Sequence, residues 1–135
     1  MSRSATTTVA AGLLALSLVG SGAGAAQAKG GNDRETRTSG GCSAGSDWKL
    51  KAKADDGRIE VELEVDSNRT RQRWSVVIRD NRARVFRGAR TTVTPSGSFS
   101  VERHIANRAG RDRITARAVN ARSGERCSAI LVYRG

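Results

Sequence analysis

The chain has 135 residues, a net charge of +11 and only 4% aromatic residues. This length suits one small domain, and two cysteines with a single histidine exclude the usual cysteine- and histidine-rich metal sites. The excess of positive charge favours association with polyanions. The preponderance of arginine over lysine is also typical of GC-rich coding. Coding bias alone then explains the positive charge, and the charge does not indicate a ligand.

Residues 1–28 have the pattern of a secretory signal peptide. Arg3 precedes an apolar run over residues 9–19, and Ala26-Gln27-Ala28 forms a small-x-small cleavage site. The apolar run is shorter than the roughly 20 residues that a membrane-spanning helix needs, and no later segment approaches that length. We therefore predict a secreted, extracellular protein that begins at Lys29 and has no transmembrane segment.

Residues 29–41 are rich in glycine, serine, threonine and charge and show no apolar periodicity. We predict that they form a flexible leader without secondary structure, and that the domain extends over residues 42–135. Because the two cysteines belong to a chain with an export signal, a Cys42–Cys127 disulfide is the default expectation. It would join the start of the domain to its last strand.

A period-two pattern begins at Trp48 and predicts a β-hairpin. Hydrophobic residues alternate with lysines before Asp56-Gly57 and with glutamates after it. A two-residue type I′ turn at this dipeptide makes one face of the hairpin apolar and the other a ladder of opposite charges. The ladder pairs are Lys49 with Glu64, Lys51 with Glu62, and Lys53 with Glu60. The facing lysines argue against a calcium site at these glutamates.

Residues 71–79 form the predicted central strand, because apolar and basic residues alternate along them. The alternation gives a core face of Trp74, Val76 and Ile78 and an outer face of Arg71, Arg73 and Arg79. Residues 83–86 form the next strand, in a register that stays open. A two-residue turn would point Val85 inward, whereas a three-residue turn would bring Phe86 inward together with Arg84.

Three further strands are predicted over residues 98–105, 113–121 and 127–133. Pairing the last two across a turn at Ser123-Gly124 sets Ile114 opposite Tyr133 and Asn120 opposite Cys127. The total is seven short strands, with a turn about every 8–12 residues, which predicts a seven-stranded antiparallel β-sandwich.

The layout resembles small secreted proteins with an immunoglobulin-like or fibronectin type III-like fold, which are common in high-GC Gram-positive bacteria. The resemblance spans residues 42–133 and is carried by Trp74 in the third strand, by Gly97-Ser98-Phe99-Ser100-Val101 and by Arg113-Ile114-Thr115-Ala116-Arg117-Ala118. It implies a β-sandwich without an assigned activity. The disulfide of an antibody domain joins two mid-sequence strands, so the cysteine positions here imply nothing about antibody-like recognition.

No catalytic, cofactor or metal signature stands out, and we predict a non-enzymatic protein without a cofactor or a resident metal. His104 shares an exposed strand face with Ser100 and Glu102, but no group orients them as a catalytic triad. We interpret His104 as a solvated surface histidine.

The candidate functional site is the outer face of a sheet that holds the strands at residues 71–79, 113–121 and 127–133. Alternation places arginines and apolar residues on this face without a carboxylate: Arg71, Arg73, Arg79, Arg113, Arg117, Arg126, Arg134, Val77, Val119, Ile130 and Val132. An apolar strip rimmed by arginine is typical of a binding surface, and guanidinium groups suit phosphate or carboxylate ligands. Alternatively, the apolar residues favour strand formation and the arginines keep the sheet soluble.

We therefore predict a secreted binding module that associates with an anionic cell-envelope polymer or a protein partner through this face. The alternative is an inhibitor of an extracellular hydrolase that presents a loop at residues 87–94 or 107–111. Nucleic acid is not expected as a physiological ligand, because the face lacks stacking aromatic residues and the chain carries an export signal.

Overall fold

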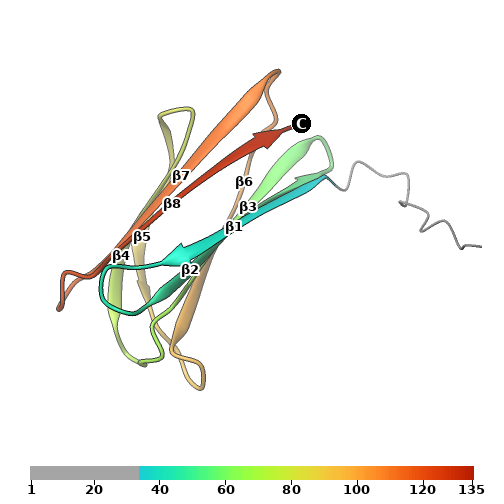
Figure 1. Cartoon of the computed structure of the whole chain (residues 1–135). Coiled ribbons are helices and arrows are strands. Elements are labelled where there is room, and N and C mark those ends of the chain that lie inside the picture. Colours follow the sequence, from blue (N-terminus) through green and yellow to red (C-terminus); the bar gives the residue numbers. More distant parts are fainter. Residues whose placement is uncertain (1–33) are drawn as a thin grey trace, which may run out of the picture.

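Eight antiparallel strands form two four-stranded sheets in the computed structural model, which describes residues 34–135 (Figure 1). Sheet A has the strand order β1-β2-β3-β6, and sheet B has the order β5-β4-β7-β8. The predicted signal peptide, residues 1–28, lies outside the described residues. The strand bounds are β1 (Glu35–Gly41), β2 (Asp47–Asp55), β3 (Arg58–Asp66), β4 (Arg73–Asp80), β5 (Ala83–Thr91), β6 (Ser98–Ala106), β7 (Arg111–Asn120) and β8 (Arg126–Arg134).

The hydrophobic core lies between the two sheets and receives side chains from both, as in a β-sandwich. Trp74 of β4 is fully buried, and its ring centroid lies 6.1 Å from that of Phe99 on β6, which belongs to the opposite sheet. Val76 and Ile78 are buried beside Trp74, so the predicted core face of the central strand is confirmed. The all-β, two-sheet prediction is confirmed, but the strand number is eight and not seven.

The additional strand is β1, in the segment that was expected to be a flexible leader. It pairs with β2 along its whole length, from Glu35 opposite Lys53 to Gly41 opposite Asp47. The strand contains no large apolar residue that alternation could reveal. Instead, β1 supplies a residue without a side chain where it passes Trp48. A Cβ atom added at Gly40 would lie only 2.8 Å from the Trp48 ring. The glycine lets the backbone of β1 cover the indole.

The β2–β3 hairpin has the predicted register, and its turn residues Asp56 and Gly57 both have positive φ, at 46° and 74°. A type I′ turn requires this conformation at both central positions. Two of the three expected lysine–glutamate pairs close as ion pairs: Lys49 with Glu64 at 3.7 Å and Lys51 with Glu62 at 3.3 Å.

The β4–β5 hairpin follows neither of the two expected registers. Its turn residues are Asn81 and Arg82, both with positive φ, and a β-bulge at Val85 of β5 lies opposite the step from Ile78 to Arg79. The bulge shifts the pairing so that Phe86 lies opposite Ile78 and is buried, while Arg84 stays exposed. A bulge adds one residue to one strand. The inward and outward alternation of side chains that holds near the turn is therefore reversed beyond the bulge.

The predicted pairing of the last two strands is wrong by two residues, because Ile114 lies opposite Leu131 and not Tyr133. The connecting turn is longer than expected. The backbone N–H of Asn120 donates to the carbonyl oxygen of Glu125 at 2.9 Å, and residues 121–124 lie between them. A shift of two residues keeps every side chain on its predicted face, so the core face and the outer face are unaffected.

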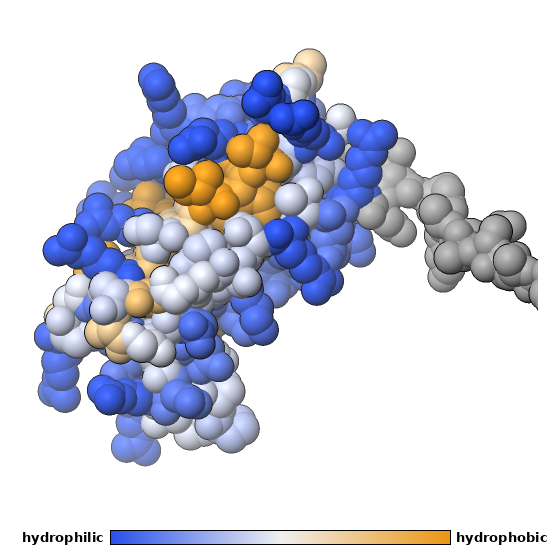
Figure 2. All heavy atoms as spheres, in the orientation of Figure 1, coloured by the Kyte–Doolittle hydropathy of each residue, from blue (hydrophilic) through white to orange (hydrophobic). Residues whose placement is uncertain are grey.

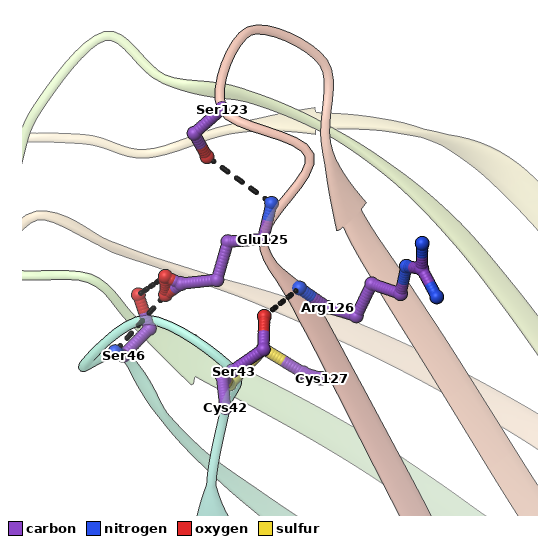
Figure 3. Close-up of a disulfide and its surroundings, with 7 residues drawn as sticks. All are labelled: Cys42, Ser43, Ser46, Ser123, Glu125, Arg126 and Cys127. Atoms are coloured by element: carbon purple, nitrogen blue, oxygen red, sulfur yellow. Dashed lines mark hydrogen bonds between the residues drawn. A yellow bond between two sulfur atoms is a disulfide. The ribbon is translucent and has the colours of Figure 1, made fainter.

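The predicted disulfide is present and links the end of β1 to β8. Next to it, Ser43 and Arg126 are joined by two hydrogen bonds, of which Figure 3 shows the one that ends on Ser43 Oγ. The Ser43 N–H donates to the Arg126 carbonyl oxygen, and the Arg126 N–H donates to Ser43 Oγ, both at 2.9 Å. The link ties a strand of sheet A to a strand of sheet B, and Figure 3 shows the Arg126 side chain extending away from it.

Glu125 is a buried carboxylate beside the same link, and it joins two loops (Figure 3). It accepts hydrogen bonds from the backbone N–H and the hydroxyl of Ser46 at 3.0 and 3.1 Å. Its own N–H donates to Ser123 Oγ at 3.2 Å. These bonds hold the β1–β2 loop against the β7–β8 turn.

Candidate binding face

The outer face of sheet B gathers most of the arginines that the sequence singled out. The expected grouping of three strands in one sheet is found, since β4, β7 and β8 are adjacent and β5 flanks β4. Outward side chains alternate with more buried ones along β4, β7 and β8. The outward arginines, which with Val77, Val119, Ile130 and Val132 we call the arginine face, are Arg73, Arg79, Arg84, Arg87, Arg111, Arg113, Arg117, Arg126 and Arg134.

Arg71 lies outside this alternation. It precedes β4 in a turn, has a φ of 59°, and its N–H donates to the carbonyl oxygen of Thr92 at 2.9 Å. Sequence reasoning missed Arg84 and Arg87 of β5, which extend the arginine face beyond β4. Arg84 and Arg87 are three residues apart and both face outward only because the bulge at Val85 lies between them, and no local pattern revealed that bulge.

The positive charge of the arginine face is uncompensated. The outward positions of β4, β5, β7 and β8 carry no carboxylate, because Asp80 and Asp112 are buried on the opposite side of the sheet. Within residues 34–135, no ion pair includes an arginine of this face. The outer face of sheet A differs, since its lysines lie opposite glutamates and two of these pairs form ion pairs.

The arginines surround a shallow depression on the β4–β5 side of the face. Val77 lies opposite Arg87 on β5 and opposite Arg117 on β7, and in the next row Arg79 lies opposite Arg84. Adjacent strands are about 4.8 Å apart, so several guanidinium groups can reach one anionic group. The depression is lined mainly by Ser75, Val77, Arg79, Arg84, Arg87 and Ala89.

An apolar strip lies on the β7–β8 side of the same face. Ile130 and Val132 of β8 are 51% and 38% exposed, although most of the large apolar residues within residues 34–135 are buried. They lie opposite Thr115 and Arg113 of β7. Figure 2 shows a hydrophobic patch over this part of the molecule, bordered by hydrophilic side chains. The face therefore offers both charge and apolar contact.

Of the two segments predicted as inhibitory loops, one is mostly strand and the other is a loop. Residues 87–94 were expected to form a loop, but β5 continues to Thr91, so most of this segment is strand. Residues 107–110 do connect β6 to β7 as an exposed loop. Inhibition by that loop stays a prediction.

Comparisons with protein-family models, curated proteins and solved structures found no match to this chain. In the described part of the chain, no helix combines the length and the hydrophobicity needed to cross a membrane. The function is therefore inferred from the fold and from the chemistry of its surfaces.

Proposed function

We propose that the protein is a secreted, non-enzymatic binding module whose arginine face associates with an anionic polymer of the cell envelope. The observation that supports this proposal is the uncompensated row of arginines around Val77, next to exposed apolar residues. A polymer with repeated phosphate or carboxylate groups matches arginines repeated on neighbouring strands. The planar guanidinium group binds such oxygens with two parallel hydrogen bonds.

The proposal includes a fibronectin type III-like fold with one added strand. Strands β2, β3 and β6 in one sheet and β5, β4, β7 and β8 in the other resemble the order of such sandwiches, and β1 extends the first sheet at its edge. Domains of this architecture occur in many cell-surface proteins. The fold alone defines no ligand, so the proposal depends on the arginine face.

Export is also part of the proposal. The pattern of residues 1–28 is that of a signal peptide, and the Cys42–Cys127 disulfide is the kind of bond that persists in oxidising compartments. Both features favour a protein that acts outside the cytoplasm.

Co-sedimentation with isolated cell envelopes tests the proposed binding. The protein without residues 1–28 is expected to pellet with envelopes at low ionic strength and to be released as salt is raised, because salt screens exposed charges. Replacing both Arg73 and Arg117 with Glu should weaken binding about tenfold or more, since each exposed ionic contact contributes up to about 1 kcal/mol. The melting temperature should stay nearly unchanged, because both side chains are exposed.

A matched control replaces Arg69 and Arg122 with Glu. Both are exposed loop residues outside the arginine face, so this variant has the same charge change. It should bind almost as well as the wild-type protein. Equal loss in both variants, or binding that ignores ionic strength, would show that the arginine face is not the binding surface.

A further inference from the structure

The lysine–glutamate ladder on the outer face of sheet A is incomplete at one position. Lys53 lies opposite Glu60, but among residues 34–135 these two side chains form no ion pair. On its other side, Glu60 lies opposite His104 of β6. The Glu60 carboxylate therefore approaches His104, at 3.7 Å, and is not held in an ion pair by the facing lysine.

Three potential metal ligands converge at this position. His104 Nε2 lies 2.8 Å from Asp55 Oδ2 and 3.7 Å from Glu60 Oε2, and all three donor atoms lie within 4.8 Å of one another. Ligand atoms about 2.1 Å from a tetrahedral ion are separated by about 3.4 Å. The observed separations are on either side of this value, so small side-chain adjustments bring the three atoms around one ion.

The backbone holds these ligands in place. Glu60 and His104 are direct cross-strand partners on β3 and β6, and Asp55 is the last residue of β2, next to the tight turn of the β2–β3 hairpin. Paired strands fix the directions of their side chains. All three side chains are partly exposed, so an ion can enter and water can complete its coordination.

We propose that Asp55, Glu60 and His104 bind a divalent first-row transition-metal ion, with zinc as the ion that this donor set fits best. One imidazole nitrogen and two carboxylate oxygens are ordinary zinc ligands, and water supplies the fourth. Calcium and magnesium prefer more numerous, all-oxygen ligands. A neighbouring group, Glu60 with Glu62 and Glu102, lacks a histidine and is not part of the proposed site.

The proposed metal site is independent of the proposed polymer binding. It lies on the outer face of sheet A, whereas the arginine face is the outer face of sheet B. A failure of either proposal therefore leaves the other standing.

Calorimetric titration of the untagged protein without residues 1–28 with zinc chloride at neutral pH tests the site. One ion per chain is expected to bind. His104→Ala and Asp55→Asn should each weaken binding at least about tenfold, because even the loss of an outer-shell partner has an effect of that size. Since His104 is the only histidine of the chain, its imidazole NMR signals should shift on addition of zinc. A tenfold excess of magnesium should not displace the zinc.

The control is Glu64→Gln, which removes one negative charge from the same sheet face without touching a proposed ligand. Its zinc affinity should stay within about twofold of the wild-type value, since exposed charges contribute little. Circular dichroism should show that every variant is folded. The proposal is overturned by the absence of saturable binding up to millimolar zinc, or by unchanged affinity in His104→Ala. It is also overturned when Glu102→Gln abolishes binding and His104→Ala does not, because the three glutamates then hold the ion.

Discussion

Asp80, at the end of β4, and Asp112, near the start of β7, are buried carboxyl groups that interact with each other. They are 6% and 0% exposed, and Asp80 Oδ1 and Asp112 Oδ2 have no hydrogen-bond partner among the described residues. Burial raises the pKa of both carboxyls, and the neighbouring Asp112 charge raises that of Asp80 further. Asn81 Nδ2 donates to Asp112 Oδ1 at 3.3 Å, which satisfies only part of the pair.

Because of the Asp80–Asp112 pair, we expect the stability of the protein to decrease as the pH rises. The folded-state pKa values lie above the ordinary value of 3.8, so above about that pH the folded protein binds more protons than the unfolded chain. The free energy of unfolding therefore falls as the pH rises from about 3.8 through the raised pKa values. Asp112→Asn removes one of the two charges and should raise the melting temperature at pH 7 by about 5 °C, corresponding to about 1 kcal/mol.

Thermal unfolding followed by circular dichroism from pH 4 to pH 8 measures this effect. The difference in melting temperature between Asp112→Asn and the wild-type protein should grow with pH. Asp47→Asn removes an equal charge from an exposed position of β2, and its difference from wild type should not grow in this way. A variant that melts below the wild-type protein at pH 7 would mean that the ionised pair stabilises the fold.

Gly97 is expected to tolerate no side chain. It has a φ of 73°, and a Cβ atom added there would lie 2.4 Å from the backbone nitrogen of Arg69. Gly124 has a φ of 74°, but a Cβ atom there would meet nothing within 4 Å. Gly124→Ala should therefore cost about 1 kcal/mol from backbone strain alone, whereas Gly97→Ala should cost more than about 3 kcal/mol. Urea unfolding measures both, and equal losses would show that the loop at Arg69 moves aside.

The Cys42–Cys127 disulfide should contribute about 4 kcal/mol to the free energy of unfolding, because it closes a loop with a sequence separation of 85 residues. Urea unfolding of the oxidised protein is compared with that of the double variant Cys42→Ser, Cys127→Ser. The wild-type protein unfolded in a reducing agent is the control for the new hydroxyl groups. A difference below about 1 kcal/mol would mean that the reduced chain is already constrained when unfolded.

Sequence patterns predicted the parts of the fold in which pairing is encoded locally. Along β2 and β3, alternation and the Asp56-Gly57 turn together determine the register, and the same alternation identified Trp74 as a core residue. The face of each strand was therefore predictable. β1 was not, because its contribution becomes visible only when Gly40 is placed against Trp48.

The parts of the two candidate sites that were missed depend on pairing between distant segments. Arg84 and Arg87 both join the arginine face only because a bulge at Val85 interrupts the alternation of β5 between them. His104 meets Glu60 because β3 pairs with β6, and these strands are separated by two strands of the other sheet. A strand's own alternation identifies its outward residues, but not the strand that lies beside it.

Asn120 is expected to set the register of β7 and β8. Its buried Oδ1 accepts hydrogen bonds from the N–H groups of Arg122 and Ser123 at 2.9 and 3.0 Å, which favours the four-residue turn over the two-residue turn at Ser123-Gly124. Asn120→Ala should lower the free energy of unfolding by about 1–3 kcal/mol, since these donors lose their partner. Asn107→Ala, in an exposed loop, should cost less than about 0.5 kcal/mol. Cross-strand NMR contacts in Asn120→Ala report the register directly. Unchanged stability with the same contacts would mean that packing of the two strands, rather than the asparagine, selects the turn.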